Sequence, residues 1–394
     1  MFPKSSPSVQ SLLKSTRGDL VIWGVAIVLA LIGIMAVYST TGTLALKLDK
    51  SHHSFLFKQI ALLGTGFVLM YLIHRLDYRF FAPIGTLLFY ISIPLLALTL
   101  AVGTTLNEGS RWLMIPGIGV TVQTSDFAKL SLFVYLARRL SFIQDDLDNQ
   151  KFVFIKIFAP VLLACALIAP ANLSTALLMG LSSGLLFFIG RIRIKQILLM
   201  LGLSLVVLSG IFCYSYETKG RAYTWVNRIK HFTSDNKNDE PFQVTQAKVA
   251  IAKGGLIGKG PGNSTQRNFL PHPYSDFIFA IIIEEYGLGG GLFVMCLYLL
   301  FLWRSIRLFQ RCPYAFGAFL AVGLSFSLVI QAFVNMAVNV NLMPVTGLTL
   351  PLVSMGGSSI LFTSITIGMI LSVSRFVEEL EGDGSESSNL NIAS

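Results

Sequence analysis

The stretch that decides the fold is Gly262–Gly287, GNSTQRNFLPHPYSDFIFAIIIEEYG, which carries polar and charged residues directly into a very apolar chain. A proline-rich turn ends at Ser275 and Asp276, and the apolar run Phe277–Ile283 follows. We therefore expect Asp276 in the first turn or at the cap of a membrane helix. That position puts a carboxylate at the boundary between water and lipid.

Glu284 and Glu285 follow Asp276 by eight and nine residues. At the rise of a helix they would lie about 12 to 14 Å deeper. An ionisable group at that depth is costly and needs a partner or a water-filled cavity. The pattern predicts a site in which Asp276 forms the lip and the two glutamates form the wall.

The composition places the chain in a membrane. Of its 394 residues 54% are hydrophobic and only 13% are charged, which is too apolar for a soluble protein. The four cysteines have no paired spacing and predict neither a disulfide framework nor a metal cluster. The net charge of +10 indicates basic loops facing anionic lipid. We find no basic-aromatic platform for nucleic acid and no signature of an organic cofactor.

The hydropathy pattern predicts an all-α polytopic membrane protein with about ten transmembrane helices. The expected ranges are 20–38, 56–74, 82–102, 126–141, 153–169, 173–189, 195–216, 276–303, 314–337 and 356–376. The first is expected to be a retained helix rather than a signal peptide. This membrane domain, 20–376, follows a tail at 1–19 and precedes a Ser-, Gly- and Glu-rich tail at 377–394 that we expect to be disordered.

Basic residues predict the orientation. If both ends lie on one side, the short loops of that side carry most of the arginines, so that side is the cytoplasm. The other side then holds loop 103–125, the large loop 217–275 and the turn 338–355. In the first of these loops, Trp112 is expected to anchor the chain at the membrane interface.

Several polar positions on the outer side have both a structural and a functional interpretation. Asp126 and Lys129 lie three apart on one helical face and form either a local ion pair or the wall of a cavity. The basic residues and glycines of 217–275 either hold a phosphate group or lie on lipid head groups.

A polar stripe precedes a broken segment near the end of the chain. Gln331, Asn335 and Asn339 recur every four residues on an otherwise apolar helix, a pattern typical of contacts between helices. Prolines and glycines follow in 341–359, and broken backbone at membrane depth is tolerated only when it is buried in protein or lines a wet cavity. This predicts a polar pocket open to the outside.

These motifs together resemble the SEDS family (shape, elongation, division and sporulation) of bacterial membrane proteins, which includes FtsW and RodA. The resemblance is carried by Gly109–Leu113, by Asp126–Leu130, and by Gly258–Glu285 with GxGxGNSxQ, LP, DFIFA and EE in order. It continues in Gln331–Met336 and Pro344–Ser358. Departures include Asp126 and Asn172, where many members carry Glu and Asp.

The resemblance implies a peptidoglycan glycosyltransferase that polymerises lipid II, the undecaprenyl-pyrophosphate-linked disaccharide-pentapeptide, outside the cytoplasmic (inner) membrane. The implied partners are a class B penicillin-binding transpeptidase and the other proteins of the division machinery, since the sequence is closer to the FtsW-like division branch than to the RodA-like elongation branch. The family's catalytic acid falls on Asp276, which would act as general base. Mg²⁺ or Mn²⁺ is a possible aid to the leaving pyrophosphate, with no metal ligands assigned.

The remaining site predictions fall into two groups. Substrate-binding residues are expected to be Arg111, Lys129, Arg228, Gln246, Lys248, Asn263, Ser264, Gln266 and Ser358. Residues expected to shape the cavity are Trp112, Asp126, Glu284, Glu285, Gln331, Asn335, Pro344, Pro351, Gly356 and Gly357.

Two other classes of function stay open at this point. The intramembrane polar residues would also suit a transporter that flips lipid II or another polyprenyl lipid. A flippase, however, needs polar lining through both leaflets, whereas these motifs gather on the outer half. A non-catalytic scaffold is the third possibility, and it predicts that Asp276 can be replaced without loss of growth.

Overall fold

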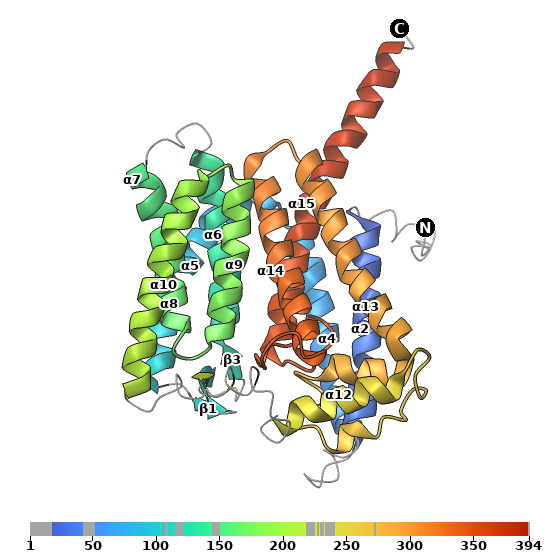
Figure 1. Cartoon of the computed structure of the whole chain (residues 1–394). Helices are drawn as coiled ribbons and strands as arrows, with labels where there is room; N and C mark the ends of the chain where they lie inside the picture. Colours follow the sequence, from blue (N-terminus) through green and yellow to red (C-terminus); the bar gives the residue numbers. More distant parts are fainter. Residues whose placement is uncertain are drawn as a thin grey trace.

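The computed structural model describes residues 18–41, 52–102, 104–106, 109–114, 121–143, 150–217, 225–226, 228, 232, 241–271 and 273–392. The fold is a helical bundle of the kind that spans a membrane several times (Figure 1). Each predicted apolar range coincides with a helix. These are α2 (Leu20–Thr40), α4 (His52–Arg75), α5 (Phe81–Val102), α6 (Thr124–Ile143), the run α7 (Gln150–Val153), η2 (Phe154–Phe158) and α8 (Ala159–Ile168), α9 (Leu173–Ile189), α10 (Ile194–Glu217), α13 (Ile278–Arg311), α14 (Ala315–Asn339) and α15 (Ser358–Ile392).

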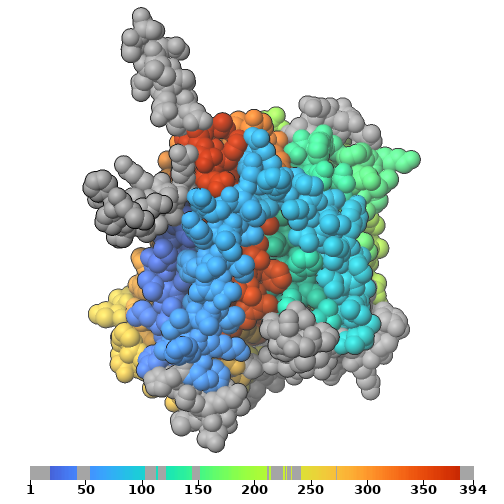
Figure 2. Space-filling model, turned by 180° about the vertical axis from the view of Figure 1, so that it is seen from behind, coloured from blue at the N-terminus to red at the C-terminus, as the bar shows by residue number. Residues whose placement is uncertain are grey.

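Length and apolar composition qualify seven helical segments of the described chain as membrane spans, and α9 and part of α10 are shorter apolar helices. The helices α14 and α15 form the centre, because 78% and 72% of their apolar windows are buried, against 22% for α4. In Figure 2 the red surface of α15 is visible between the blue α4 and the cyan α5. The outer helices therefore present apolar side chains to lipid while α14 and α15 carry the core.

The start of the described chain contacts α15 and α13 at one end of the bundle. The backbone N–H of Asp19 donates to Ser374 Oγ at 2.9 Å, and the Asp19 carboxylate pairs with Arg304 at 2.6 Å. The Asp19 side chain also caps α2 by accepting from the N–H of Val21 at 2.9 Å. In Figure 1 the helix α12 (Phe242–Gly254) and the strands lie at the opposite end.

Two parts of the chain have more regular structure than expected. Loop 103–125 contains an antiparallel sheet of β1 (Thr104–Leu106), β2 (Gly109–Met114) and β3 (Thr121–Gln123), in which Trp112 pairs with Gln123. Short polar strands carry no long apolar period, so the hydropathy pattern did not indicate them. The final helix continues to Ile392, whereas the composition predicted disorder after Glu378.

The helix α13 is broken near its start. Gly287 has φ 70° and ψ −175°, so residues 278–286 and 288–311 are separate helical pieces. Backbone N–H groups of the preceding loop bind the carbonyls at the break, Lys259 to Glu284 O at 3.0 Å and Gly260 to Glu285 O at 2.9 Å. A Cβ at Gly258 would lie 2.3 Å from Glu285 O, so only glycine permits this close approach.

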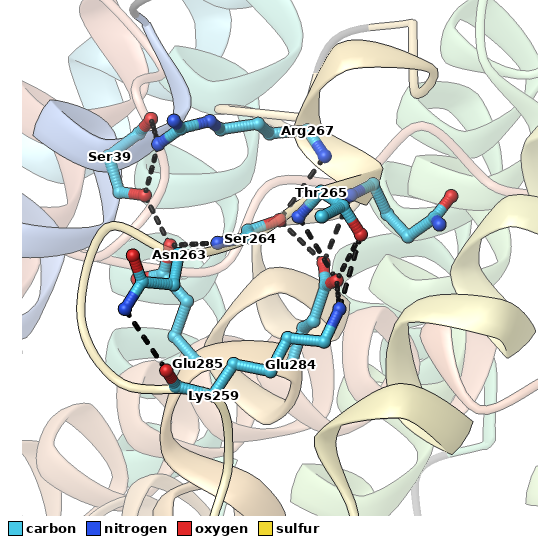
Figure 3. Close-up of polar contacts among 9 residues, drawn as sticks. Ser39, Lys259, Asn263, Ser264, Thr265, Arg267, Glu284 and Glu285 are labelled. Carbon is cyan, nitrogen blue, oxygen red and sulfur yellow. Dashed lines mark hydrogen bonds and ion pairs between the residues drawn. The ribbon is translucent and has the colours of Figure 1, made fainter.

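The two glutamates lie at the end of the short helix 278–286, just before the break. Glu284 is fully buried and accepts hydrogen bonds from Lys259 Nζ at 2.7 Å and from the hydroxyl of Ser264 at 2.5 Å (Figure 3). Glu285 accepts from the hydroxyl of Ser39 in the last turn of α2. The sequence predicted that ionisable groups at these positions need partners, and the outer loop and α2 supply them. The carboxylates bind the outer loop to the ends of α2 and α13, and this satisfies them in a buried place.

The segment between α14 and α15 folds back into the bundle. Pro351 O accepts a 2.5 Å hydrogen bond from Tyr298 in the membrane part of α13, and a Cβ at Gly33 would lie 2.8 Å from Leu352 O. Gly33 precedes the end of α2 by seven residues, so the segment reaches about 10 Å into the bundle. Leu352 is buried with φ 63°, an uncommon conformation for a large side chain that this packing maintains. We call residues 344–357 the re-entrant segment.

We expect the Gly33→Ala substitution to destabilise the fold by about 1–3 kcal/mol, because the new methyl group would press on backbone atoms of Leu352 and Val353 that cannot move independently. Thermal unfolding in detergent would measure the change. The control is Gly24→Ala in the same helix, where a Cβ meets nothing within 4 Å. That variant is expected to be unchanged or slightly more stable, and equal losses in the two variants would contradict the proposed contact.

We expect the Glu284→Gln substitution to cost about 3 kcal/mol of folding stability, because it leaves the Lys259 ammonium beside a buried neutral group. Denaturant titration of the purified protein would measure it. The matched control is Glu381→Gln, which removes an Arg311 pair of the same 2.7 Å length whose side chains are about half exposed. Since exposed pairs contribute at most about 1 kcal/mol, a similar loss in both variants would exclude the clamping role of Glu284.

Candidate functional site

Asp276 lies in a turn just before α13. The turn covers 273–277, the residue at the N-cap is Phe277, and the helix begins at Ile278. The expectation that Asp276 caps the helix or stands in its first turn is therefore wrong by one or two residues. Its carboxylate accepts a 2.8 Å hydrogen bond from the hydroxyl of Ser275, and the residue is partly exposed. The Asp276 side chain is thus oriented by Ser275 and is not the N-cap of α13.

The backbone of Asp276 is fixed by the polar stripe of α14. Asn335 Nδ2 and Asn339 Nδ2 each donate to Asp276 O at 2.9 Å. The Asn339 side-chain oxygen accepts from the N–H of Ala280 at 3.0 Å, which also ties the first turn of α13 to α14. Asn335 donates in addition to Leu348 O at 2.6 Å. The stripe therefore joins three segments through backbone carbonyls and an N–H group, so both asparagines are buried with their amides satisfied.

The re-entrant segment supports the same turn from its other side. Ser354 Oγ donates to Ser275 O at 2.6 Å, and the N–H of Met355 donates to Tyr274 O at 2.9 Å. Burial raises the pKa of the Tyr274 phenol and the negative charge of Asp276 raises it further, so this phenol stays protonated at neutral pH. The backbone carbonyls of three consecutive residues, 274–276, are thereby held by side-chain or backbone donors.

The basic side chain of Lys129 contacts α14 one helical turn before Asn335. Lys129 Nζ donates to Gln331 Oε1 at 2.6 Å and lies 3.9 Å from the Asp126 carboxylate. Gln331 Nε2 donates to Thr349 O at 2.9 Å. Gln331 precedes Asn335 by one turn, so the Lys129 group lies about 6 Å along α14 from the residues that hold Asp276. The nearest partner of Lys129 is therefore an amide of the stripe, while the predicted ion pair with Asp126 is the longer contact.

A small polar cavity adjoins Lys129. Its lining includes Gln123, Asp126, Lys129, Thr175, Gln331 and Ser359 together with Gly347–Thr349. A second small cavity continues inward between α6, α14 and α15, past Ser327 and Thr363 to Phe133, Leu324 and Thr366. The sequence predicted a polar pocket open to the outside, and the first of these cavities lies beside the broken segment at Gly347–Thr349.

The other predicted residues separate into those near this site and those away from it. Arg228 Nη1 donates to Val345 O at 3.0 Å, beside the re-entrant segment that contains Pro344, Pro351, Gly356 and Gly357. Ser358 Oγ accepts from the N–H of Gln123 at 3.1 Å and joins α15 to β3. Trp112 is half-buried in β2, Lys248 is exposed on α12, and Gln246 is half-buried there. The Arg111 side chain lies outside the described residues.

Some predicted residues lie away from Asp276, in a cluster around the two glutamates. We call Glu284 and Glu285 with their partners Ser39, Lys259 and Ser264 the glutamate clamp. Ser264 and Gln266 are 3% exposed, and Ser264 Oγ and the Gln266 N–H both donate to Glu284. Their burial does not fit the substrate contact that we expected of them. Asn263 is exposed and its amide donates to Lys259 O at 3.1 Å. The two glutamates likewise bind this loop through their side chains.

Two supports of the re-entrant segment could not be recognised in the sequence. Tyr298 lies in an ordinary apolar stretch of α13, and only its hydroxyl contact with Pro351 O distinguishes it. Gly33 is one of many membrane-helix glycines, and its role appears only when the re-entrant segment packs on it. Ser354 belongs to a motif of the resemblance, but its partner Ser275 is 79 residues away in the chain.

Comparison with known proteins places this geometry in a family. The model of the family FTSW_RODA_SPOVE, described as cell cycle protein, matches residues 19–379. Stage V sporulation protein E of Bacillus subtilis is 34% identical over 374 residues, covering 92% of this chain and 98% of its own length. The probable peptidoglycan glycosyltransferase FtsW of Geobacter sp. (strain M18) is 34% identical over 368 residues, covering 90% and 96%.

Solved structures share the fold. One, described as showing structural coordination of polymerization and crosslinking by a peptidoglycan synthase complex, superposes with a TM-score of 0.70 at 24% identity, covering 91% of this chain and 98% of its own. The rod shape determining protein RodA of Thermus thermophilus superposes with a TM-score of 0.64 at 24% identity, covering 91% and 97%. With a family match over most of its length and relatives above 30% identity, this multi-pass membrane protein belongs to the FtsW, RodA and SpoVE family of cell cycle proteins, the SEDS family.

Proposed function

We propose that the protein is a peptidoglycan glycosyltransferase that polymerises lipid II during cell division, with Asp276 as the general base. The observation that carries the proposal is the turn at Asp276, whose backbone is bound by Asn335, Asn339 and Ser354 while the residue stays partly exposed. Pre-positioned acids of this kind suit proton transfer. The printed names of the relatives, peptidoglycan glycosyltransferase among them, give the reaction class.

The proposed chemistry follows from two requirements of glycosyl transfer. Asp276 accepts the proton of the acceptor sugar hydroxyl as its oxygen forms the new bond to the anomeric carbon of the donor. The bond from that carbon to the pyrophosphate breaks, and the departing oxygens carry away the electron pair. Cationic side chains stabilise the charge that develops there, and Arg228, Lys129 and Lys248 are our candidates for this role.

A divalent ion has no protein cage among the described residues, which hold no group of three or more His, Cys, Asp and Glu side chains close enough to bind a metal. We therefore assign any Mg²⁺ or Mn²⁺ to the pyrophosphate of the substrate, since Mg²⁺ in such sites takes much of its coordination from phosphate and water oxygens. No step above depends on that ion.

We further propose that the site faces the outside of the bacterial cytoplasmic membrane and that both chain ends are cytoplasmic. The chain ends meet at the end of the bundle opposite to Asp276, where loops and helix ends also carry Arg75, Arg79, Arg138, Arg139, Arg307 and Arg311. We propose a class B penicillin-binding protein as the partner. The structural neighbour from a peptidoglycan synthase complex motivates that choice, and the FtsW relatives favour the division machinery over the elongation machinery.

The observation that would support a flippase is the inner of the two small cavities, because it extends the polar lining of the site into the bundle. Its lining includes two large apolar side chains, Phe133 and Leu324, as well as the polar Thr366. A transport path would need polar lining to continue past them, so this observation favours the polymerase.

We expect the Asp276→Asn substitution to lower polymerisation of purified lipid II by a factor of about 10²–10⁴, because the amide accepts no proton at neutral pH. The fold should survive, since α14 and the re-entrant segment hold backbone atoms rather than the carboxylate. Glycan strands formed in detergent, with and without the transpeptidase partner, would be counted by gel. A folded variant that polymerises at the wild-type rate would remove Asp276 as the base.

We expect the Asn339→Ala substitution to lower kcat about 10-fold or more with little change in KM, because it removes one of the two amides that bind the Asp276 carbonyl, frees the Ala280 N–H and lets the base move. The control in the same helix is Ser325→Ala, which removes a buried hydroxyl bonded only to Ala321 of its own helix. Steady-state kinetics and thermal unfolding of both variants separate positioning from stability. Equal kcat in the two variants at equal stability would refute the positioning role.

A further inference from the structure

The turn between α12 and α13 exposes two large apolar side chains. Leu256 is 77% exposed and Ile257 is 90% exposed, and Ile257 is the most exposed large hydrophobic residue of the described chain. Both precede the glutamate clamp in a loop that is otherwise rich in polar residues. Side chains of this kind are normally covered by something apolar.

The turn is rigid, so the exposure is not that of a loose loop. Gly255 and Gly258 adopt φ values of 54° and 86°, and the N–H of Gly258 donates to Gly254 O at 2.8 Å. The N–H of Leu288 donates to Gly255 O at 2.9 Å, and a Cβ at Gly287 would lie 2.2 Å from Leu256 O. The backbone of the turn is therefore fixed against the break in α13, and the two side chains must point away from it.

The turn adjoins a surface that faces lipid. The next piece of α13 begins at Leu288. Its apolar side chains Leu288, Leu292 and Phe293 are each more than 40% exposed. In Figure 2 yellow atoms, the colour of residues near 250, stand out from the side of the molecule beside the blue α2. The exposed Leu256–Ile257 pair is therefore adjacent to the exposed apolar side chains at the start of this piece of α13.

We propose that Leu256 and Ile257 form a wedge that inserts into the acyl chains of the outer leaflet. Lipid is the occupant because the wedge is continuous with the lipid-facing residues of α13. The exposed Lys253 in the last turn of α12 is placed to meet lipid phosphate groups. The wedge would tie the outer loop to the membrane at the break in α13, and so set the level of the glutamate clamp relative to the lipid surface. This inference is independent of the catalytic role of Asp276.

The test uses tryptophan as a depth probe. The Ile257→Trp protein is reconstituted into phosphatidylcholine vesicles with brominated acyl chains, and its fluorescence is compared with that of the parent chain, whose four tryptophans supply the background. We expect the added fluorescence to fall several-fold in brominated lipid and to resist quenching by aqueous iodide. The matched control is Asn263→Trp, at an exposed polar position of the same loop, for which we expect the opposite pattern.

Two results would overturn the proposal. Iodide quenching of Ile257→Trp equal to that of Asn263→Trp, without quenching by bromine, would place the wedge in water. Protection from both quenchers would place it against protein, such as a second copy of the chain. Leu256→Trp serves as a second probe in case the first variant does not fold, and size-exclusion chromatography in detergent reports folding independently of any enzymatic activity.

Discussion

The structure depends on one constraint, which is that backbone carbonyls and N–H groups inside a membrane bundle must be bound by protein donors and acceptors. Near Asp276 two segments leave helical conformation, the turn 273–277 and the re-entrant segment 344–357. Side-chain amides at Gln331, Asn335 and Asn339 bind the carbonyls that these segments expose. Spacing of four residues puts the three amides in a row along α14, so one helix serves both broken segments.

This arrangement explains how a loop residue can be held rigidly. Loops are ordinarily the most mobile parts of a protein, and a catalytic group needs a defined position. The turn at Asp276 is held by hydrogen bonds from α14 and from Ser354 of the re-entrant segment. Among the seven candidate spans, α14 has the largest buried share of its apolar window. These contacts bind the backbone of the turn, while the Asp276 carboxylate accepts a hydrogen bond from the neighbouring Ser275 hydroxyl.

The glutamate clamp holds the other end of the short helix 278–286. A helix that stops at Gly287 leaves carbonyls without intrahelical partners, and the glycine-rich loop 254–262 supplies N–H groups to them. Glu284 and Glu285 then bind the same loop through their side chains. The short helix is therefore fixed at both ends, by Asn339 at its start and by the loop at its finish.

Sequence alone determined the membrane class, the approximate helix ranges and the family, because long apolar periods and ordered motifs are local properties of the chain. It also located Asp276 and the amide stripe, since an acid before an apolar run and a repeat of four are visible in one dimension. The break at Gly287 and the burial of Glu284 were decided only by tertiary structure, because a helix-compatible run of residues does not reveal that a distant loop will bind its carbonyls. For the same reason the partners of Gly33, Tyr298 and Ser354 could not be predicted. Each is joined to a segment at least 50 residues away, and such contacts arise from packing rather than from local pattern.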